Sequence, residues 1–154
     1  MSRFVVVQRL GCLALAAAML PWLGSVKAAD VDPNVAMITP PDQIKWVKGR
    51  GSDNAVLAGD PSKPGIYVTL VKWHPHNMSR PHFHPNDRYI LVLSGTWWVG
   101  TGSKYDPDST VPVKAGSFVT HFAKQIHYDG AKDEEAVLEI VGEGPATATP
   151  AETK

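Results

Sequence analysis

Two histidines one residue apart, His82 and His84, are the residues whose types and spacing most directly suggest chemistry. They precede a run rich in β-branched and apolar residues, 88–93. If the pair lies in extended backbone, the alternation of side chains places both imidazoles on one face, about 7 Å apart along the strand. Two such imidazoles can bind one metal ion when a third ligand comes from elsewhere in the chain. The pair therefore predicts part of a metal site.

The remaining histidines lie close to this pair in the sequence, since all six fall between residues 74 and 127 of the 154-residue chain. Histidine is the commonest metal-binding side chain, so their clustering favours a metal site. Any one of them taken alone is more typical of a structural or exposed position. The six are His74, His76, His82, His84, His121 and His127.

The first 28 residues have the pattern of a cleavable signal peptide. Residues 1–9 carry two arginines and no acid, residues 10–24 form an apolar run, and small residues precede a cleavage point after Ala28. The run of roughly 15 apolar residues is shorter than the ~20 that a membrane-spanning helix needs. Cys12 lies at the start of the apolar run rather than after it, which argues against a lipoprotein. We expect a periplasmic or secreted protein that does not stay in the membrane after cleavage.

Cleavage changes the charge and the cysteine content of the chain. Arg3, Arg9 and Lys27 leave with the signal peptide, so 15 basic residues become 12 against 15 acidic ones, and the net charge falls from 0 to −3. A mildly acidic chain gives no reason to expect a nucleic-acid partner. The only cysteine is also removed, so core packing, helped by a metal, must stabilise the exported protein.

Beyond residue 28 the pattern is that of one all-β domain. Short β-type segments alternate with turns about every 8–12 residues, and no stretch keeps a 3.6-residue apolar period over about ten residues. We expect an extended lead-in over residues 29–43, a β-sandwich or barrel over residues 44–142, and a flexible tail over residues 143–154, which are rich in Pro, Ala, Thr and Glu. The clearest strand candidates are residues 66–73, 88–93, 96–99, 117–122 and 136–141.

Two spacings in the chain resemble the two sequence motifs of the cupin superfamily. The first motif, G-x5-H-x-H-x3-E-x6-G, is matched by His76-x5-His82-x-His84-x3-Arg88-x6-Gly95. The second, G-x5-P-x-G-x2-H-x3-N, is matched by Gly116-x5-Phe122-x-Lys124-x2-His127-x3-Ala131. The three motif histidines, the closing glycine and the glycine of the second motif are in register. The chain is therefore similar to small single-domain bacterial cupins of the RmlC-like kind over residues 67–141.

The resemblance implies a double-stranded β-helix, the jelly-roll barrel, with a site inside its mouth. It also implies that a divalent metal (iron, manganese, nickel or zinc) binds to His82, His84 and His127. Phe122 and Lys124 alter the turn before His127 without removing a ligand, and His121 is favoured as a structural strand residue over a fourth ligand. Cupins commonly dimerise, so a homodimer is implied as well.

Arg88 stands where cupins carry a glutamate ligand. A guanidinium is not deprotonated in proteins, so it cannot ligate a metal. Three interpretations remain: the site has three histidines and open positions, Arg88 binds the carboxylate of a substrate, or Arg88 turns outward to pair with Asp87 or a neighbouring acid. His76 could also serve as a substitute fourth ligand, more readily than Asp87, which follows Asn86 in a predicted turn.

The two adjacent tryptophans can be assigned to faces if residues 94–95 form a two-residue hairpin turn. Val92 then pairs with Trp97 and Leu91 with Trp98, and directly paired residues share a face of the sheet. Trp97 would line the barrel interior with Arg88, and Trp98 would pack outside. A bulge would reverse the two.

These residues are compatible with two functions. One is a periplasmic metal-dependent enzyme of the oxygenase type acting on a small anionic organic substrate. Arg88 would bind the anion, Trp97 would form an apolar wall, and Tyr128 and His121 are weaker catalytic candidates. The other is a non-catalytic module that binds a metal or small ligand. Iron or manganese with oxygen uptake would indicate the enzyme, and tightly held zinc with no open position would indicate the module.

Overall fold

The computed structural model describes residues 31–154, and the predicted signal peptide lies outside these residues. Among them, no helix is long and apolar enough to cross a membrane. The described residues up to Ile38 belong to a unit of their own, in which the Asp32 carboxylate accepts a hydrogen bond from the backbone N–H of Asn34. The lead-in is not extended throughout, because Pro41–Gln43 form a short 3-10 helix, η1.

The second unit, residues 39–154, is built almost entirely of β-strands, as the sequence predicts. The second short 3-10 helix, η2, spans Pro107–Ser109. The strands are β1 (Ser52–Ala58), β2 (Gly65–Trp73), β3 (Asn77–Met78), β4 (His82–Phe83), β5 (Arg88–Ser94), β6 (Thr96–Thr101), β7 (Val111–Lys114), β8 (Phe118–His121), β9 (His127–Ala131), β10 (Ala136–Gly144) and β11 (Thr149–Pro150).

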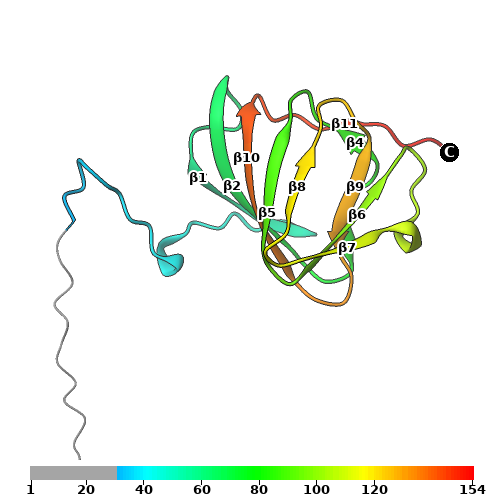
Figure 1. Ribbon diagram of the computed structural model, residues 1–154, viewed down its shortest axis with the longest axis horizontal. Coiled ribbons are helices and arrows are strands. Elements are labelled where there is room, and N and C mark those ends of the chain that lie inside the picture. The colour runs from blue at the N-terminus through cyan, green and yellow to red at the C-terminus, as the bar shows by residue number, and fades with distance from the viewer. Residues whose placement is uncertain (1–30) are drawn as a thin grey trace, which may run out of the picture. The chain divides into compact units, whose positions relative to one another are not determined.

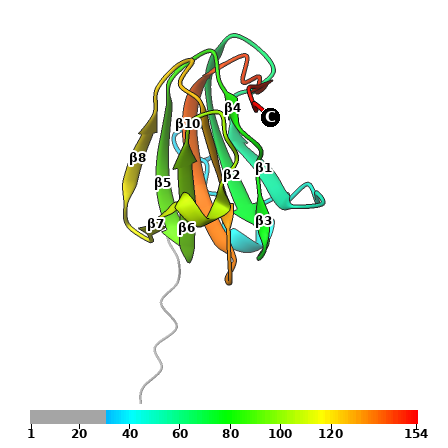
Figure 2. The ribbon, with the colours of Figure 1, turned by 90° about the vertical axis from the view of Figure 1, so that its right-hand side faces the viewer.

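The strands form two antiparallel sheets, visible in Figure 1 and turned by 90° in Figure 2. The five-stranded sheet has the order β1-β2-β10-β5-β8. The six-stranded sheet has the order β11-β4-β9-β6-β7, and β3 also pairs with β9. Strands that are neighbours in a sheet are mostly distant in the sequence, as in jelly-roll barrels. β4 and β9, which carry histidines, are therefore brought side by side by topology.

Apolar side chains from both sheets meet in one core. The core forms because each strand turns one face inward. In β10, for example, buried and more exposed residues alternate along most of the strand. Burying each large side chain stabilises the fold by about 1.5–3 kcal/mol. The core residues are Tyr67, Val71, Ile90, Val92, Trp97, Ala131, Ala136, Leu138 and Ile140.

The two tryptophans show that β5 and β6 do not form the predicted hairpin. β5 pairs with β10 and β8, whereas β6 pairs with β7 and β9 in the other sheet. The chain passes between the sheets at Gly95, whose φ is +71°. Trp97 is nevertheless interior, at 1% exposure, and Trp98 lies under the ammonium of Lys132, 4.0 Å from the ring centroid. The predicted pairing is wrong, but the interior position of Trp97 is as predicted.

The C-terminal residues also differ from expectation, because the predicted flexible tail contributes a strand. β10 continues to Gly144, and β11 pairs with β4. The N–H of Ala151 donates to the carbonyl of Pro81 at 2.9 Å, and Arg80 forms an ion pair with Glu152. The polar composition of this segment predicted a flexible tail. Backbone hydrogen bonds to β4 order the segment instead, and such bonds cannot be recognised from composition.

Gly95 provides a test of the crossing between the sheets. Its positive φ disfavours any residue with a Cβ, and a Cβ there would also run into the carbonyl oxygen of Glu135. Gly95→Ala should therefore lower the free energy of unfolding by about 2–4 kcal/mol, measured by urea denaturation. Gly102→Ala is the matched control: its φ is +92°, but nothing lies within 4 Å of the added Cβ, so the loss should be about 1 kcal/mol. Equal losses of unfolding free energy in the two variants would show that the clash with Glu135 does not contribute.

Candidate metal centre

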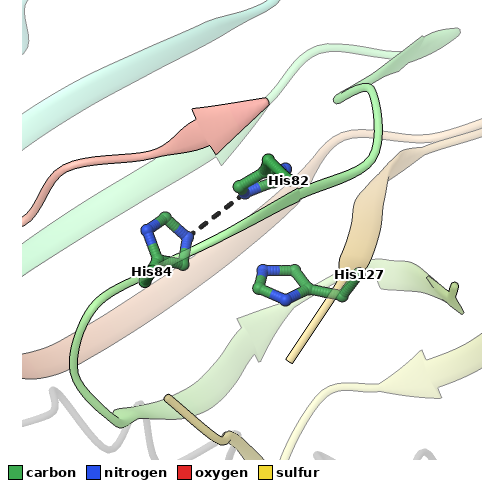
Figure 3. Close-up of side chains that lie close together, drawn as sticks. All are labelled: His82, His84 and His127. Atoms are coloured by element: carbon green, nitrogen blue, oxygen red, sulfur yellow. Dashed lines mark hydrogen bonds between the residues drawn. The ribbon is translucent and has the colours of Figure 1, made fainter. Parts of the chain in front are cut away.

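Three histidines from two segments converge at one end of β4 and β9. His82 lies in β4, His84 lies just after it, and His127 opens β9 and is paired in register with His82. Their ring centroids lie 4.6 Å apart for His82 and His127, 4.9 Å for His82 and His84, and 5.3 Å for His84 and His127. Figure 3 shows the three rings turned toward a common point. The structure therefore brings together the three histidines that the sequence singled out.

Each of these imidazoles is oriented by a backbone carbonyl. Nδ1 of His82 lies 2.8 Å from the carbonyl oxygen of Arg80, and Nδ1 of His127 lies 3.0 Å from that of Gln125. Nδ1 of His84 lies 2.8 Å from the carbonyl oxygen of Thr147, in the C-terminal segment. A carbonyl oxygen only accepts, so Nδ1 must carry the proton in all three rings. In the neutral rings, Nε2 therefore presents an unprotonated lone pair.

These lone pairs face one another, which is the arrangement a metal ion requires. Nε2 of His82 and Nε2 of His84 lie 3.2 Å apart, and neither can donate to the other when both rings are neutral with Nδ1 protonated (Figure 3). Nε2 of His127 is buried without a hydrogen-bond partner among residues 31–154. Two nitrogens bound to one ion at about 2.1 Å would lie about 3.0–3.4 Å apart. The donor set therefore fits a divalent metal.

Arg88 points into this group of histidines rather than outward. Its Nη1 lies 2.6 Å from Nε2 of His84, and its Nε is buried with no hydrogen-bond partner in the described part of the chain. The hypothesis that Arg88 pairs with Asp87 is wrong, because the Asp87 carboxylate instead accepts a hydrogen bond from the N–H of Ala123 at 2.7 Å. A permanent cation therefore stands beside the proposed ligands.

Two other residues suggested by the sequence lie away from the histidines. His76 is exposed in a turn with a φ of +61°, and it belongs to neither group of residues able to hold a metal. The ring of Tyr128 packs where a Cβ on Gly100 would be, and its hydroxyl donates to the carbonyl of Asp106 at 2.9 Å. Tyr128 follows His127 directly in β9, so it points to the opposite face. Neither residue contributes to the centre in this structure.

Two residues that sequence reasoning undervalued complete the centre. The ring of His121 lies 3.8 Å from that of His127, centroid to centroid, and its buried Nε2 has no partner within residues 31–154. Asp129 is a buried residue of β9, and it accepts a hydrogen bond from Nε1 of Trp97 at 3.3 Å. The two-residue spacing of His127 and Asp129 could have revealed Asp129, because residues two apart in a strand lie on the same face.

These residues line a cavity of about 380 Å³ inside the barrel. Its polar wall includes His82, Arg88, His121 and Asp129, and Trp97 contributes to the apolar wall. The rest of the apolar lining comes from the core strands: Val71, Trp73, Ile90, Leu138 and Ile140. A mostly apolar cavity with a few convergent polar groups is the usual form of a small-molecule site.

Burial keeps the imidazoles of His84, His121 and His127 neutral. Burial, and then the Arg88 cation, lowers the pKa of His84 from 6.5 to about 3. Burial, and then neighbouring His127, lowers the pKa of His121 to about 2. Burial also lowers the pKa of His127, although the Asp129 carboxylate opposes the shift. Near neutral pH a metal can therefore bind these rings without proton release, once Nε2 of His84 gives up its hydrogen bond from Arg88.

Comparison with known proteins establishes the fold. No protein-family model and no curated protein matches the chain. Among solved structures, the polyketide cyclase RemF from Streptomyces resistomycificus is 17% identical, with a TM-score of 0.62 over 77% of this chain and 87% of RemF. An uncharacterised double-stranded β-helix protein from Klebsiella pneumoniae is 20% identical, with a TM-score of 0.59 over 77% of this chain and 99% of that one.

A cupin-2 domain from Rhodospirillum rubrum is also similar, at 15% identity and a TM-score of 0.57 over 77% of this chain and 80% of that one. At such identities the likeness concerns the fold alone. The chain thus has the cupin fold, a double-stranded β-helix of the RmlC-like kind, as the sequence motifs predict.

The depressed pKa values predict that the metal-free protein loses stability on acidification. Folded His84 and His121 stay neutral down to about pH 3 and about pH 2, whereas in the unfolded chain they take up protons below pH 6.5. The unfolded state binds more protons in this window, so the free energy of unfolding falls as the pH falls. Urea denaturation of chelator-treated protein from about pH 7 to about pH 4.5 measures the slope, up to about 1.4 kcal/mol per pH unit for each histidine.

His121→Gln should flatten this dependence, because it removes one of the buried histidines whose pKa is lowered. His76→Gln, at an exposed position outside the centre, should leave it unchanged. A His121→Gln protein with the parental slope would contradict the assignment.

Proposed function

We propose that this chain is an exported metal-dependent enzyme of the oxygenase type that acts on a small anionic organic molecule. In this proposal His82, His84 and His127 bind a divalent metal while Arg88 binds the anion. The observation that carries it is the convergence of three Nε2 lone pairs, each set by a carbonyl bond at Nδ1, beside an internal cavity. Export rests on the sequence of residues 1–28.

Charge balance makes an anionic substrate the best fit. The three histidine ligands bring no negative charge to the proposed metal position and Arg88 brings a positive one, so an anion close to both the metal and Arg88 favours metal binding there. The guanidinium uses Nη1 on His84 and leaves its buried Nε unpartnered among the described residues. A carboxylate suits the remaining donors, because a guanidinium binds carboxylates through two parallel hydrogen bonds.

The cavity limits the size and character of the substrate. A volume of about 380 Å³ lies at the lower end for ligand pockets, so the substrate is small. The indole of Trp97 and neighbouring apolar side chains form the apolar part of the cavity lining. The substrate should therefore combine a carboxylate with a short apolar or aromatic body.

The metal, when bound, supplies Lewis acidity and, if it is iron or manganese, redox chemistry at its open positions. The residues of the chain do the rest. Arg88 orients the anion, Trp97 shapes the apolar wall, and His121 and Asp129 are the remaining polar groups in the cavity that can accept a proton. RemF, a polyketide cyclase with the same fold, supports catalysis by this kind of barrel, although the fold alone does not specify a reaction.

A second function, a non-catalytic module that binds a metal or small ligand, is favoured by one observation. Tyr128, a candidate acid or base, is committed to the carbonyl of Asp106 outside the cavity. Metal analysis of the mature protein separates the two functions. Iron or manganese with oxygen uptake on carboxylate substrates supports the enzyme, and tightly held zinc without oxygen uptake supports the module.

A homodimer is also part of the proposal. The outer face of the five-stranded sheet exposes Tyr89, Leu91 and Leu93 of β5 at 46%, 38% and 44%, and Phe118 of β8 at 65%. Tyr89 and Phe118 stack with ring centroids 6.4 Å apart. Such an apolar patch on one sheet is typical of a surface that a second subunit covers.

His127→Ala should abolish metal binding, because His127 supplies a buried Nε2 that no other described residue replaces. Elemental analysis of protein purified after export should fall from about one equivalent to near zero. His76→Ala is the control, since His76 is exposed outside the centre and its loss should leave the metal content unchanged. Full metal in His127→Ala protein would show that the site is misassigned.

Arg88→Glu should bind metal at least tenfold more tightly in the absence of substrate. The change removes a cation beside Nε2 of His84 and introduces a carboxylate ligand. Calorimetric titration with Co²⁺ measures the affinity, and adding His84→Ala should cancel the gain. Weaker binding by the Arg88→Glu protein would mean that the guanidinium supports the metal position.

A further inference from the structure

A second group of metal-binding atoms lies deeper in the barrel. His121, His127 and Asp129 each offer one atom, and these atoms lie within 4.8 Å of one another. All three residues are buried, at 8%, 4% and 8% exposure. His121 comes from β8 of the five-stranded sheet, whereas His127 and Asp129 come from β9 of the other sheet. We call this group the inner set, and His82, His84 and His127 the outer set.

The inner set brings the unprotonated Nε2 of His127 close to the carboxylate of Asp129. Nε2 of His127 is unprotonated, because Nδ1 donates to Gln125, and it lies 3.9 Å from Oδ2 of Asp129. Nε2 of His121 is also buried without a partner in the described chain. Buried polar atoms are almost always satisfied, so these orphaned atoms indicate a ligand. A cation between them would satisfy all three.

The charges of the two sets differ in a way that decides where a cation is more stable. The outer set is neutral, and Arg88 lies 2.6 Å from one of its donor atoms. The inner set includes the Asp129 carboxylate, held by the indole N–H of Trp97. Two histidines and one carboxylate with open positions form the donor set that suits Fe²⁺ and related divalent ions. Without an anion on Arg88, the inner set is the more favourable position.

We propose that, in the protein free of an anionic ligand, one divalent cation is bound by His121, His127 and Asp129. The two sets share His127, whose Nδ1 is committed to Gln125, so only Nε2 is available and one chain holds one ion at either position. An anion on Arg88 removes the repulsion at the outer set and favours the outer position. This inference rests on the proposed function only in assuming that the centre binds a divalent ion through His127.

The test is titration of the metal-free mature protein with Co²⁺ alone, in buffer without carboxylates, followed by calorimetry and visible absorption. Asp129→Asn keeps the size of the side chain and an oxygen that can accept from Trp97, but removes the charge. It should lower the Co²⁺ affinity at least tenfold and change the absorption spectrum. The His82→Gln/His84→Gln protein should still bind one Co²⁺ per chain, and adding Asp129→Asn to it should abolish that binding.

Circular dichroism and thermal unfolding of each metal-free variant show that the barrel is intact, and His121→Gln provides a second variant of the inner set should Asp129→Asn fail to fold. The proposal is overturned if Asp129→Asn and His121→Gln bind Co²⁺ with parental affinity and spectrum while the His82→Gln/His84→Gln protein has lost it. That result leaves the three-histidine site standing. If His127→Gln also binds normally, the proposed function fails as well.

Discussion

The hydrogen bond from Nδ1 of a histidine to a backbone carbonyl is the interaction on which the centre depends. It occurs in His82, His84 and His127, and in each ring it fixes both the orientation and the tautomer. Because the proton is held at Nδ1, the lone pair at Nε2 has to point into the centre. The scaffold thus prepares donor atoms before any ligand arrives, and burial keeps them neutral.

Arg88 and Asp129 give the cavity a half-buried cation and a buried anion, and this pair defines what the centre can hold. Both line the same cavity, and the imidazoles between them are neutral. A dication gains from Asp129 and loses from Arg88, whereas an organic anion does the reverse. A metal ion and an organic carboxylate bound together compensate the charges of Asp129 and Arg88 better than either ligand alone. Arg88 in place of the usual acid therefore couples the two ligands.

Local patterns in the sequence predicted what depends on local geometry. Short β-type segments indicated an all-β domain, and motif spacing gave the cupin barrel and His82, His84 and His127. Trp97 is interior as predicted, although the hairpin pairing from which this was predicted is wrong. The pairing of β5 was predicted wrongly, because alternation is the same whether the next strand continues the sheet or crosses to the other one at Gly95. Asp129 was missed because the charged residues shortly after it are typical of a turn. Strand β11 was missed because composition does not show which backbone groups form hydrogen bonds.

The C-terminal segment makes the orientation of one histidine in the centre depend on complete folding of the chain. His82 and His127 are oriented by carbonyls only two residues away, so their rings can be preset in a partly folded chain. His84 is oriented by a carbonyl 63 residues away, in the segment before β11. Contacts between such distant residues form late, after the loop-closure entropy has been overcome. In the proposed function, high metal affinity therefore requires the completed barrel.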